Sequence, residues 1–394
     1  MTERRVYADY NATTPLKDEV KAAIISDLDV YGNPSSMHSL GRLARARVEE
    51  ARASVGALLG APPQDITFCS GGTEANNIVF QTMRRLASDP DGRPLKEGKS
   101  EIISLAIEHP CVYNSAEYSK KLGFNVKYIP VDEHGKIKMD VYKAELSEKT
   151  LFVSVMMANN EIGTIQDLKE ITRLAKECGA FVHSDAVQAV GKIPVNVLDL
   201  GVDYLSMSAH KIYGPKGIGA FYAKIGAPLL PLMFGGHQEE GRRSGTYNNT
   251  GILALGKAAA LALSDLDEYQ KKTSALRLRL KDGLLAKIPN IKINGHPTDV
   301  LPNTLNVSFP GAEGEAILLS MDIAGIEAST GSACASGSLE PSHVLVAIGL
   351  EPELAHGSIR FSLGWGTSEE DVNYIIETMP SIIQKLRAMS TLGA

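Results

Sequence analysis

The sequence has 394 residues, 44% hydrophobic and 22% charged, which predicts one globular chain with a large core or two and excludes a disordered or fibrous protein. The net charge is −6 and the basic residues are scattered along the chain, so nucleic acid is not an expected partner. The sequence has neither a signal-peptide core nor an apolar run of roughly 18 residues, and we expect a soluble, cytoplasmic protein that does not bind a membrane.

The four cysteines, Cys69, Cys111, Cys178 and Cys334, lie far apart and form no CxxC pair. This spacing indicates neither a zinc site nor a disulfide framework and is typical of a reducing compartment. Cys69 and Cys111 lie in or beside apolar runs and are expected to be small buried hydrophobes, while Cys178 ends a predicted helix.

Short apolar runs alternate with helical patterns through the first two thirds of the chain. This alternation predicts an α/β fold with a mainly parallel sheet that is covered on both faces. The predicted strands are residues 65–69, 101–107, 150–157, 180–184, 202–206 and 218–222. The predicted helices include residues 38–59, 74–87, 111–122 and 167–178.

The pattern changes near residue 250. A long, bent helix over 250–288 is followed by strands at 291–294 and 303–308, a helix at 313–323 and another helix at the C-terminus. We therefore predict a large domain over residues 15–257 and a smaller α+β domain made of residues 1–14 and 258–394.

Five polar clusters follow predicted strands, at the edge of the sheet where open α/β folds bind their ligands. They are Ser70–Glu74, His109, the pair Asn159 and Asn160, the pair Asp185 and Gln188, and the pair His210 and Lys211.

Lys211 lies in Ser-Ala-His-Lys-Ile-Tyr-Gly-Pro-Lys-Gly, directly after a buried strand. A partly desolvated lysine has a lowered pKa and is nucleophilic toward an aldehyde, whereas the alternative reading is a solvated turn residue. Asp185 can pair with a protonated pyridine nitrogen, the contact that makes pyridoxal phosphate (PLP) an electron sink, or it can act as a helix N-cap.

Gly71, Gly72 and Thr73 stand at the start of a predicted helix, where free N–H groups and the helix dipole favour an anion such as phosphate. The alternative is a plain helix cap that uses Thr73 or Ser70. The flat ring of His109 suits stacking on a pyridine, and its alternative role is purely structural.

Small residues surround Cys334 in Gly-Ser-Ala-Cys-Ala-Ser-Gly-Ser. This composition is typical of a mobile loop, which we place at about residues 328–340. Among the four thiols, Cys334 has the setting suited to movement between sites.

Taken together, these motifs resemble the cysteine desulfurases of the NifS/IscS type. The resemblance runs in order from residue 6 to about 367 through the motifs at 9–15, 31–36, 70–77, 159–163, 183–188, 208–217, 243–246 and 331–342. It implies the fold-type I PLP-dependent transferase fold with a seven-stranded-type sheet, and a homodimer whose active sites lie at the subunit interface. One departure is Tyr247-Asn248, where many relatives carry an acidic residue before the asparagine.

The resemblance also implies a role for each matching residue. Lys211 would form the imine with PLP, and His109 would stack on the ring and help to move protons. The further cofactor contacts implied are Asp185 to the pyridine nitrogen, Gln188 to the ring hydroxyl, and Gly72, Thr73, Ser208, His210 and the other subunit's Thr246 to the phosphate. The implied substrate contacts are Asn11, Asn160 and Arg360, because a guanidinium fork matches a carboxylate. The alternative for Arg360 is a structural ion pair.

The activity implied is removal of sulfur from L-cysteine to give L-alanine and a persulfide on Cys334. The sulfur would pass to an iron–sulfur scaffold protein of the NifU/IscU type, with Cys334 as a transient cluster ligand shared with that partner. One alternative is an aminotransferase of the same fold, which has no use for a loop thiol. Another is a catalytically silent scaffold, which would not need Lys211, Asp185, His109 and Cys334 together.

Overall fold

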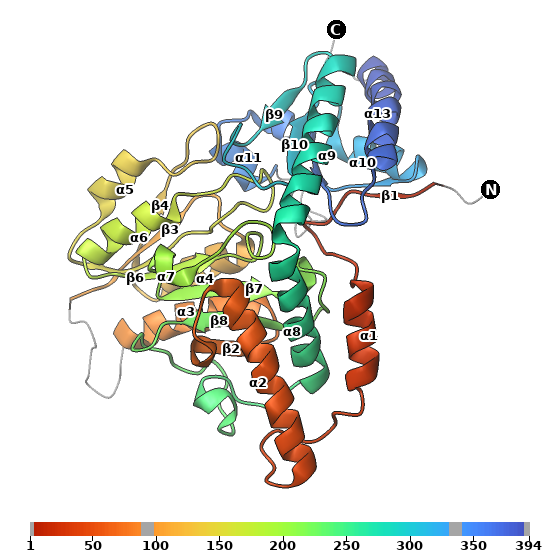
Figure 1. The fold of residues 1–394 in the computed structure, drawn as a ribbon. Helices are drawn as coiled ribbons and strands as arrows, with labels where there is room; N and C mark the ends of the chain where they lie inside the picture. The colour runs from red at the N-terminus through yellow and green to blue at the C-terminus, as the bar shows by residue number, and fades with distance from the viewer. Residues whose placement is uncertain (1–3, 88–97, 331–340, 390–394) are drawn as a thin grey trace.

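The computed structural model describes residues 4–87, 98–330 and 341–389. A seven-stranded sheet lies at the centre of its larger part (Figure 1). In spatial order the strands are β2 (Ile66–Cys69), β8 (Gly219–Ala223), β7 (Tyr204–Ser208), β6 (Phe181–Asp185), β5 (Thr150–Ser154), β3 (Glu101–Leu105) and β4 (Asn125–Ile129). Only β8 runs against its neighbours within this sheet, so the predicted mainly parallel sheet is confirmed.

Both faces of this sheet are buried, as a parallel sheet requires. Adjacent residues of one strand belong to different cores, since Val153 packs in one hydrophobic cluster and Phe152 in another. The same alternation holds for Leu205 and Tyr204, because successive side chains of a strand point to opposite faces.

Helices supply the covering layers. They are α1 (Asp18–Asp27), α2 (Ser39–Leu59), α3 (Gly72–Ala87), α4 (Pro110–Lys121), α5 (Met139–Glu145), α6 (Leu168–Glu177), α7 (Val197–Leu200) and α8 (Asn249–Ser264). Helix α8 packs against both α1 and α2, and the three lie side by side in Figure 1. Short 3₁₀ helices occur at η1 (Pro63–Asp65), η2 (Ala209–Lys211) and η3 (Gln238–Gly241).

A second, smaller sheet lies beyond α8 and is antiparallel (Figure 1). Its strand order is β12 (Ser358–Ser362), β10 (Thr304–Ser308) and β9 (Lys292–Asn294), and β1 (Val6–Tyr7) pairs separately with β11 (Ile326–Glu327). The helices here are α9 (Leu266–Lys287), α10 (Gly314–Ile323), α11 (His343–Ala347), α12 (Pro352–His356) and α13 (Glu369–Met389). No helix in the described ranges is long and apolar enough to cross a membrane.

The predicted bent helix over 250–288 is two helices, α8 and α9, which meet at Asp265. The Asp265 carboxylate accepts hydrogen bonds from Lys17 and Ser264, and its backbone leaves the helical region with φ −100° and ψ 5°. In the seven-stranded and three-stranded sheets, two strands were not predicted. Strand β4 is an edge strand with alternating polar residues, and β12 carries Arg360 between serines, although all five of its residues are buried.

The predicted domain boundary stays a prediction. A hydrophobic cluster of the smaller part joins Val6 and Ala8 to residues between 276 and 383. Val344, Leu345 and Ile348, however, pack in the core of the larger part. The chain therefore returns to the first core between β10 and β12, two strands of the second sheet.

His183 is buried in the middle of the large sheet. Its ring nitrogens lie 2.9 Å from Ser154 Oγ on β5 and 3.0 Å from Ser206 Oγ on β7. Its ring stacks on Phe152. Burial lowers the pKa of His183 from 6.5 to about 3, so the folded protein holds this ring neutral.

We therefore expect stability to fall as the pH drops below about 6.5, because the unfolded chain then binds a proton that folded His183 refuses. The stability from neutral His183 is fully present above the unfolded pKa and is lost on the way down to the folded one. Relative to pH 8, wild type should lose about 2 kcal/mol more unfolding free energy at pH 5 than His183→Gln does, measured by urea titration. Equal pH dependence in the two proteins would contradict this account, and His356→Gln, on the exposed side of α12, is the matched control.

Candidate active site

A cavity of about 370 Å³ opens at the carboxyl ends of the parallel strands. Its lining comes from at least five segments that are far apart in the sequence. The residues are Asn11, Ala12, Gly72, Thr73, His109, Pro110, Cys111, Met156, Ala158, Asn160, Glu161, Asp185, Val187, Gln188, Ser208, His210, Lys211, His343 and Arg360. The five predicted polar clusters thus meet at one place.

Lys211 is the last residue of the short helix η2, which follows β7, and it lines the cavity. Its Nζ donates to the carbonyl oxygens of Asn11 at 2.5 Å and Ala12 at 2.7 Å. The reading of Lys211 as a solvated turn residue is therefore wrong, because its amine is held by the N-terminal segment against the cavity.

Asp185 is buried at the end of β6. Its Oδ2 accepts a hydrogen bond from Asn76 Nδ2 at 2.7 Å, and its Oδ1 accepts from the Val187 N–H at 3.0 Å. The residues after it form turns, so the reading of Asp185 as a helix N-cap is wrong. No basic side chain of the described residues lies within ion-pair distance, which leaves this buried carboxylate with neutral donors alone.

His109 is the N-cap of α4 and also lines the cavity. Its Nδ1 accepts from the Cys111 N–H at 3.2 Å and lies 3.0 Å from Cys111 Sγ. Burial lowers the pKa of His109, while the charge of Asp185 partly raises it. The low pKa favours the neutral form of the ring. His109 therefore has a structural role as the N-cap and also lines the cavity.

The N-terminus of α3 begins at Gly72, so its N–H groups face the cavity beside Ser208 and His210. A Cβ on Gly72 would lie 2.6 Å from Val187 Cγ2, so a side chain at this position would close the cavity wall. Burial, and then the charges of Lys211, Lys216 and Lys192, lowers the pKa of His210 to about 4. A neutral ring can still donate one hydrogen bond to an anion.

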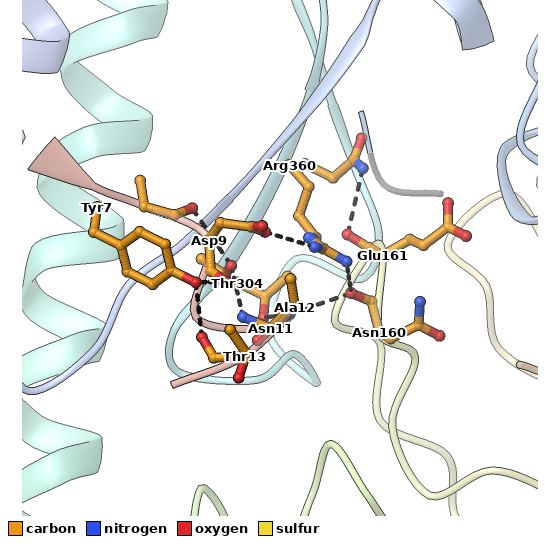
Figure 2. Close-up of polar contacts among 12 residues, drawn as sticks. Tyr7, Asp9, Asn11, Ala12, Thr13, Asn160, Glu161, Thr304 and Arg360 are labelled. Carbon is orange, nitrogen blue, oxygen red and sulfur yellow. Dashed lines mark hydrogen bonds and ion pairs between the residues drawn. The ribbon is translucent and has the colours of Figure 1, made fainter. Parts of the chain in front are cut away.

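Arg360 is buried on β12 and reaches the cavity from the smaller sheet. Its guanidinium donates to Asp9 Oδ1 at 2.7 Å and to the Asn160 carbonyl at 3.0 Å, as Figure 2 shows. The structural ion pair and the place on the cavity wall therefore coexist. Asn11 donates to the same Asn160 carbonyl at 3.2 Å, which joins the N-terminal segment to this group.

Two predicted residues lie apart from this group. Thr246 is exposed and is not among the described residues that line the cavity of its own chain. Cys334, and with it most of the predicted loop 328–340, lies outside the described residues. The residues on either side of the undescribed stretch are anchored near the cavity. Ser329 exchanges backbone hydrogen bonds with Arg360, and Ser342 Oγ donates to Glu161 Oε2 at 2.5 Å.

The cysteine predictions have mixed outcomes. Cys69 is buried and burial raises its pKa to about 12, which confirms its role as a small apolar side chain. Cys178 is the C-cap of α6, as predicted. The prediction for Cys111 is wrong, because Cys111 lines the cavity and accepts a hydrogen bond from Asn76 Nδ2 at 3.0 Å. Apolar neighbours in sequence do not reveal that the first turn of α4 faces the cavity.

Three further polar residues at or behind the cavity were not predicted: Glu161, Lys192 and His343. Glu161 follows Asn160 directly, so its place in that motif was a usable signal. Burial raises the pKa of Glu161, while Ser342, His343 and Arg360 oppose this rise. Lys192 and His343 carry no signal of their own, since each is a lone basic residue in an apolar stretch.

The family model for class-V aminotransferases matches residues 6–375, and the chain therefore belongs to the class-V aminotransferase family. A cysteine desulfurase IscS from Dictyoglomus turgidum is 46% identical over 98% of this chain and 97% of its own length. A cysteine desulfurase from Trichormus azollae is 49% identical over 98% of this chain and 94% of its own. Within the class, the chain groups with the cysteine desulfurases.

Solved structures agree with this grouping. A NifS-like protein has a TM-score of 0.89 at 39% identity and covers 97% of this chain and 100% of its own. A protein named SspA, solved in complex with cysteine, has a TM-score of 0.78 at 32% identity over 91% of this chain and 98% of its own. The predicted family and fold class are confirmed.

Cys111 tests the electrostatics of the cavity. Burial, and then the charge of Asp185, raises its pKa to about 12. Its thiolate fraction at neutral pH should be about three thousandfold below that of a free thiol, whose pKa is about 8.5. Iodoacetamide should therefore label Cys111 slowly in the native protein and quickly after unfolding, as read by peptide mass spectrometry. Rapid native labelling at this position would show that the cavity stabilises a thiolate there.

Proposed function

We propose that this chain is a PLP-dependent cysteine desulfurase that converts L-cysteine to L-alanine and a persulfide on Cys334. The observation that carries the proposal is the meeting of Lys211, Asp185, His109 and Arg360 in one cavity, in a chain that groups with the cysteine desulfurases. The relatives named above support the activity through their names, and the cysteine complex of SspA supports the substrate.

The cavity residues fit PLP in charge and shape. Buried Asp185 has neutral donors alone, so a protonated pyridine nitrogen would compensate its charge. The start of α3 at Gly72, together with Thr73, Ser208 and His210, offers the donors that a phosphate needs, and Thr246 of a second subunit would add a hydroxyl. His109 would lie on one face of the ring and Gln188 would donate to its hydroxyl.

When bound, PLP supplies an aldehyde that links to amines and a ring that accepts electrons. Lys211 provides the amine that holds the cofactor, and its carbonyl partners at residues 11 and 12 keep that amine in place. The Lys211 amine would also be placed to carry a proton from the substrate Cα. His109, kept near neutrality by burial, is the second group that can hold a proton here.

Arg360 and Asn160 bind the substrate carboxylate in this proposal, and Asn11 lies beside them. The guanidinium is already oriented by Asp9 and by the Asn160 carbonyl, so little side-chain freedom is lost when a carboxylate arrives. The buried position of Arg360 excludes water from that contact.

Sulfur transfer is the step that needs Cys334. Its thiolate attacks the sulfur of the substrate, so a sulfur–sulfur bond forms and the substrate Cβ–S bond breaks. The electron pair of the broken bond stays on Cβ, which takes up one proton. The product, L-alanine, then leaves. The sulfur remains on Cys334 as a persulfide.

The proposal extends to the partners of the reaction. The enzyme acts as a cytoplasmic homodimer and passes its sulfur to an iron–sulfur scaffold of the NifU/IscU type, with Cys334 as a transient cluster ligand. The exposed position of Thr246, away from the cavity of its own chain, supports a site completed by a second subunit. The names of the IscS relatives support the link to cluster assembly.

Lys211→Ala should abolish the visible absorption of the PLP-loaded enzyme and lower alanine production by at least about 10³-fold, because among the described residues Lys211 is the lysine that lines the cavity. The matched control is Lys216→Ala, which removes an exposed lysine from the same segment and should retain both signals. A normal visible band in Lys211→Ala would refute the role of Lys211.

Cys334→Ser should keep PLP and substrate binding but lose at least about 10³-fold in alanine and sulfide production, because a serine hydroxyl is barely ionised and has little affinity for sulfur. Wild type treated with cysteine should gain one sulfur atom on the Cys334 peptide by mass spectrometry. Cys178→Ser is the control and should load sulfur normally. Added sulfur found on Cys69, Cys111 or Cys178 of Cys334→Ser would place the nucleophile elsewhere.

A further inference from the structure

Lys192 is a buried lysine directly behind the cavity, with 2% of its surface exposed. Its Nζ donates to Gln188 Oε1 at 2.6 Å and to Asn11 Oδ1 at 2.8 Å. A buried amine is costly to fold unless its hydrogens are bonded, and here both bonds go to the side-chain amides of residues that line the cavity.

The contact with Lys192 decides how both amides are turned. The two ends of an amide side chain have nearly the same shape, but one end only accepts and the other only donates. Since the amine of Lys192 donates to both side chains, the atoms that face it must be the oxygens of Asn11 and Gln188.

The side chain of Asn11 is then fully used. Its oxygen accepts from Lys192 and, at 3.0 Å, from Asn303 Nδ2. Its nitrogen donates to Thr304 Oγ1 at 2.8 Å and to the Asn160 carbonyl at 3.2 Å (Figure 2). Four partners exhaust the hydrogen-bonding capacity of an amide, so they fix the peptide whose carbonyl holds Lys211.

Gln188 keeps one position open. Its oxygen accepts from Lys192, and one of its two N–H groups donates to the Asn11 carbonyl at 2.9 Å. What remains on the nitrogen is a single N–H, and Gln188 lines the cavity. Gln188 therefore offers the cavity a donor.

We propose that Lys192 is a positioning residue of the desulfurase site, which holds the Gln188 amide so that its free N–H meets the ring oxygen of the cofactor. The inference rests on the proposed function, because it needs PLP in the cavity. Without Lys192 the Gln188 oxygen is buried without a donor, and the side chain turns to find one, so the ring oxygen loses its partner.

The charge distribution supports this role. Burial, and then the charges of Lys211 and Arg360, holds the pKa of Lys192 well below its ordinary value. A neutral amine still has two N–H groups, which is the number that its two amide partners use. Lys192 therefore orients both amides in either protonation state.

The test is Lys192→Met, which keeps the length of the side chain and removes its donors. A hydrogen bond to the ring oxygen stabilises the negative charge left there when the chromophore loses a proton. Losing that bond should raise the pH midpoint of the visible band of the PLP-loaded enzyme by about one unit. Should Lys192→Met fail to fold, Lys192→Gln replaces it. The new glutamine can still donate to the Gln188 oxygen, but its own oxygen can also accept from a flipped Gln188 amide, so the upward shift of the midpoint should be smaller.

A double-mutant cycle separates positioning from the charge of Lys192 alone. Gln188→Met should raise the midpoint as much as Lys192→Met does, and the double variant should shift no further. The other titratable and charged groups that line the cavity are the same in every arm: His109, Cys111, Glu161, Asp185, His210, Lys211, His343 and Arg360. The proposal is overturned if the two single shifts add in full in the double variant. It is also overturned if Lys192→Met leaves the midpoint unchanged.

Two controls complete the design. Tyr142→Phe removes the buried hydroxyl that bonds the Ile171 carbonyl away from the cavity, and it should keep the wild-type midpoint even if stability falls. Wild type that forms no visible band with PLP would refute the proposed function itself. A band of normal strength whose midpoint ignores Lys192 would refute this inference alone.

Discussion

The backbone carbonyl group of Asn11 is the contact on which the site depends most, because it accepts hydrogen bonds from two side chains that line the cavity. It accepts from Lys211 Nζ and from Gln188 Nε2, so both side chains are positioned by one peptide near the N-terminus. The side chain of Asn11 in turn bonds Lys192, behind the cavity, and Asn303, the residue directly before β10. Asn11 therefore connects the Lys211 amine, Lys192 and the start of β10.

The electrostatics of the cavity follow from burial. Burial lowers the pKa of His109 and His210, which favours their neutral forms, and burial raises the pKa of Glu161. Attraction of anions is left to Arg360, to Lys211 and to the start of α3, while Asp185 is the acid placed to meet a cation. Charge is thus separated by position along the cavity, which orients a ligand that is itself anionic at its ends and cationic within.

The sequence predicted the parallel sheet and most of the cavity wall, because those features depend on local order. Lys211, Asp185 and His109 each follow a strand, and strand ends of a parallel sheet meet at one edge. The contact between Asn11 and Lys192 could not be predicted in this way, since 181 residues separate the two partners and the motif around Asn11 gives no sign of which residue it contacts. The exposure of Cys111 to the cavity was missed for a related reason. His109 is the N-cap of α4, and this cap sets the orientation of the first turn, which carries Cys111.

The residues on either side of the undescribed cysteine segment are held at the cavity by hydrogen bonds, so the chain between them limits how far Cys334 can lie from the cavity. Ser329 is bonded to the backbone of Arg360, and Ser342 is bonded to Glu161, both of which line the cavity. Five residues of fully extended chain span roughly 17 Å, which bounds how far Cys334 can lie from Ser329. In the proposed reaction, attack on the substrate sulfur would depend on an effective concentration that chain length sets, so a longer or shorter tether would change sulfur transfer without touching any group that binds the substrate.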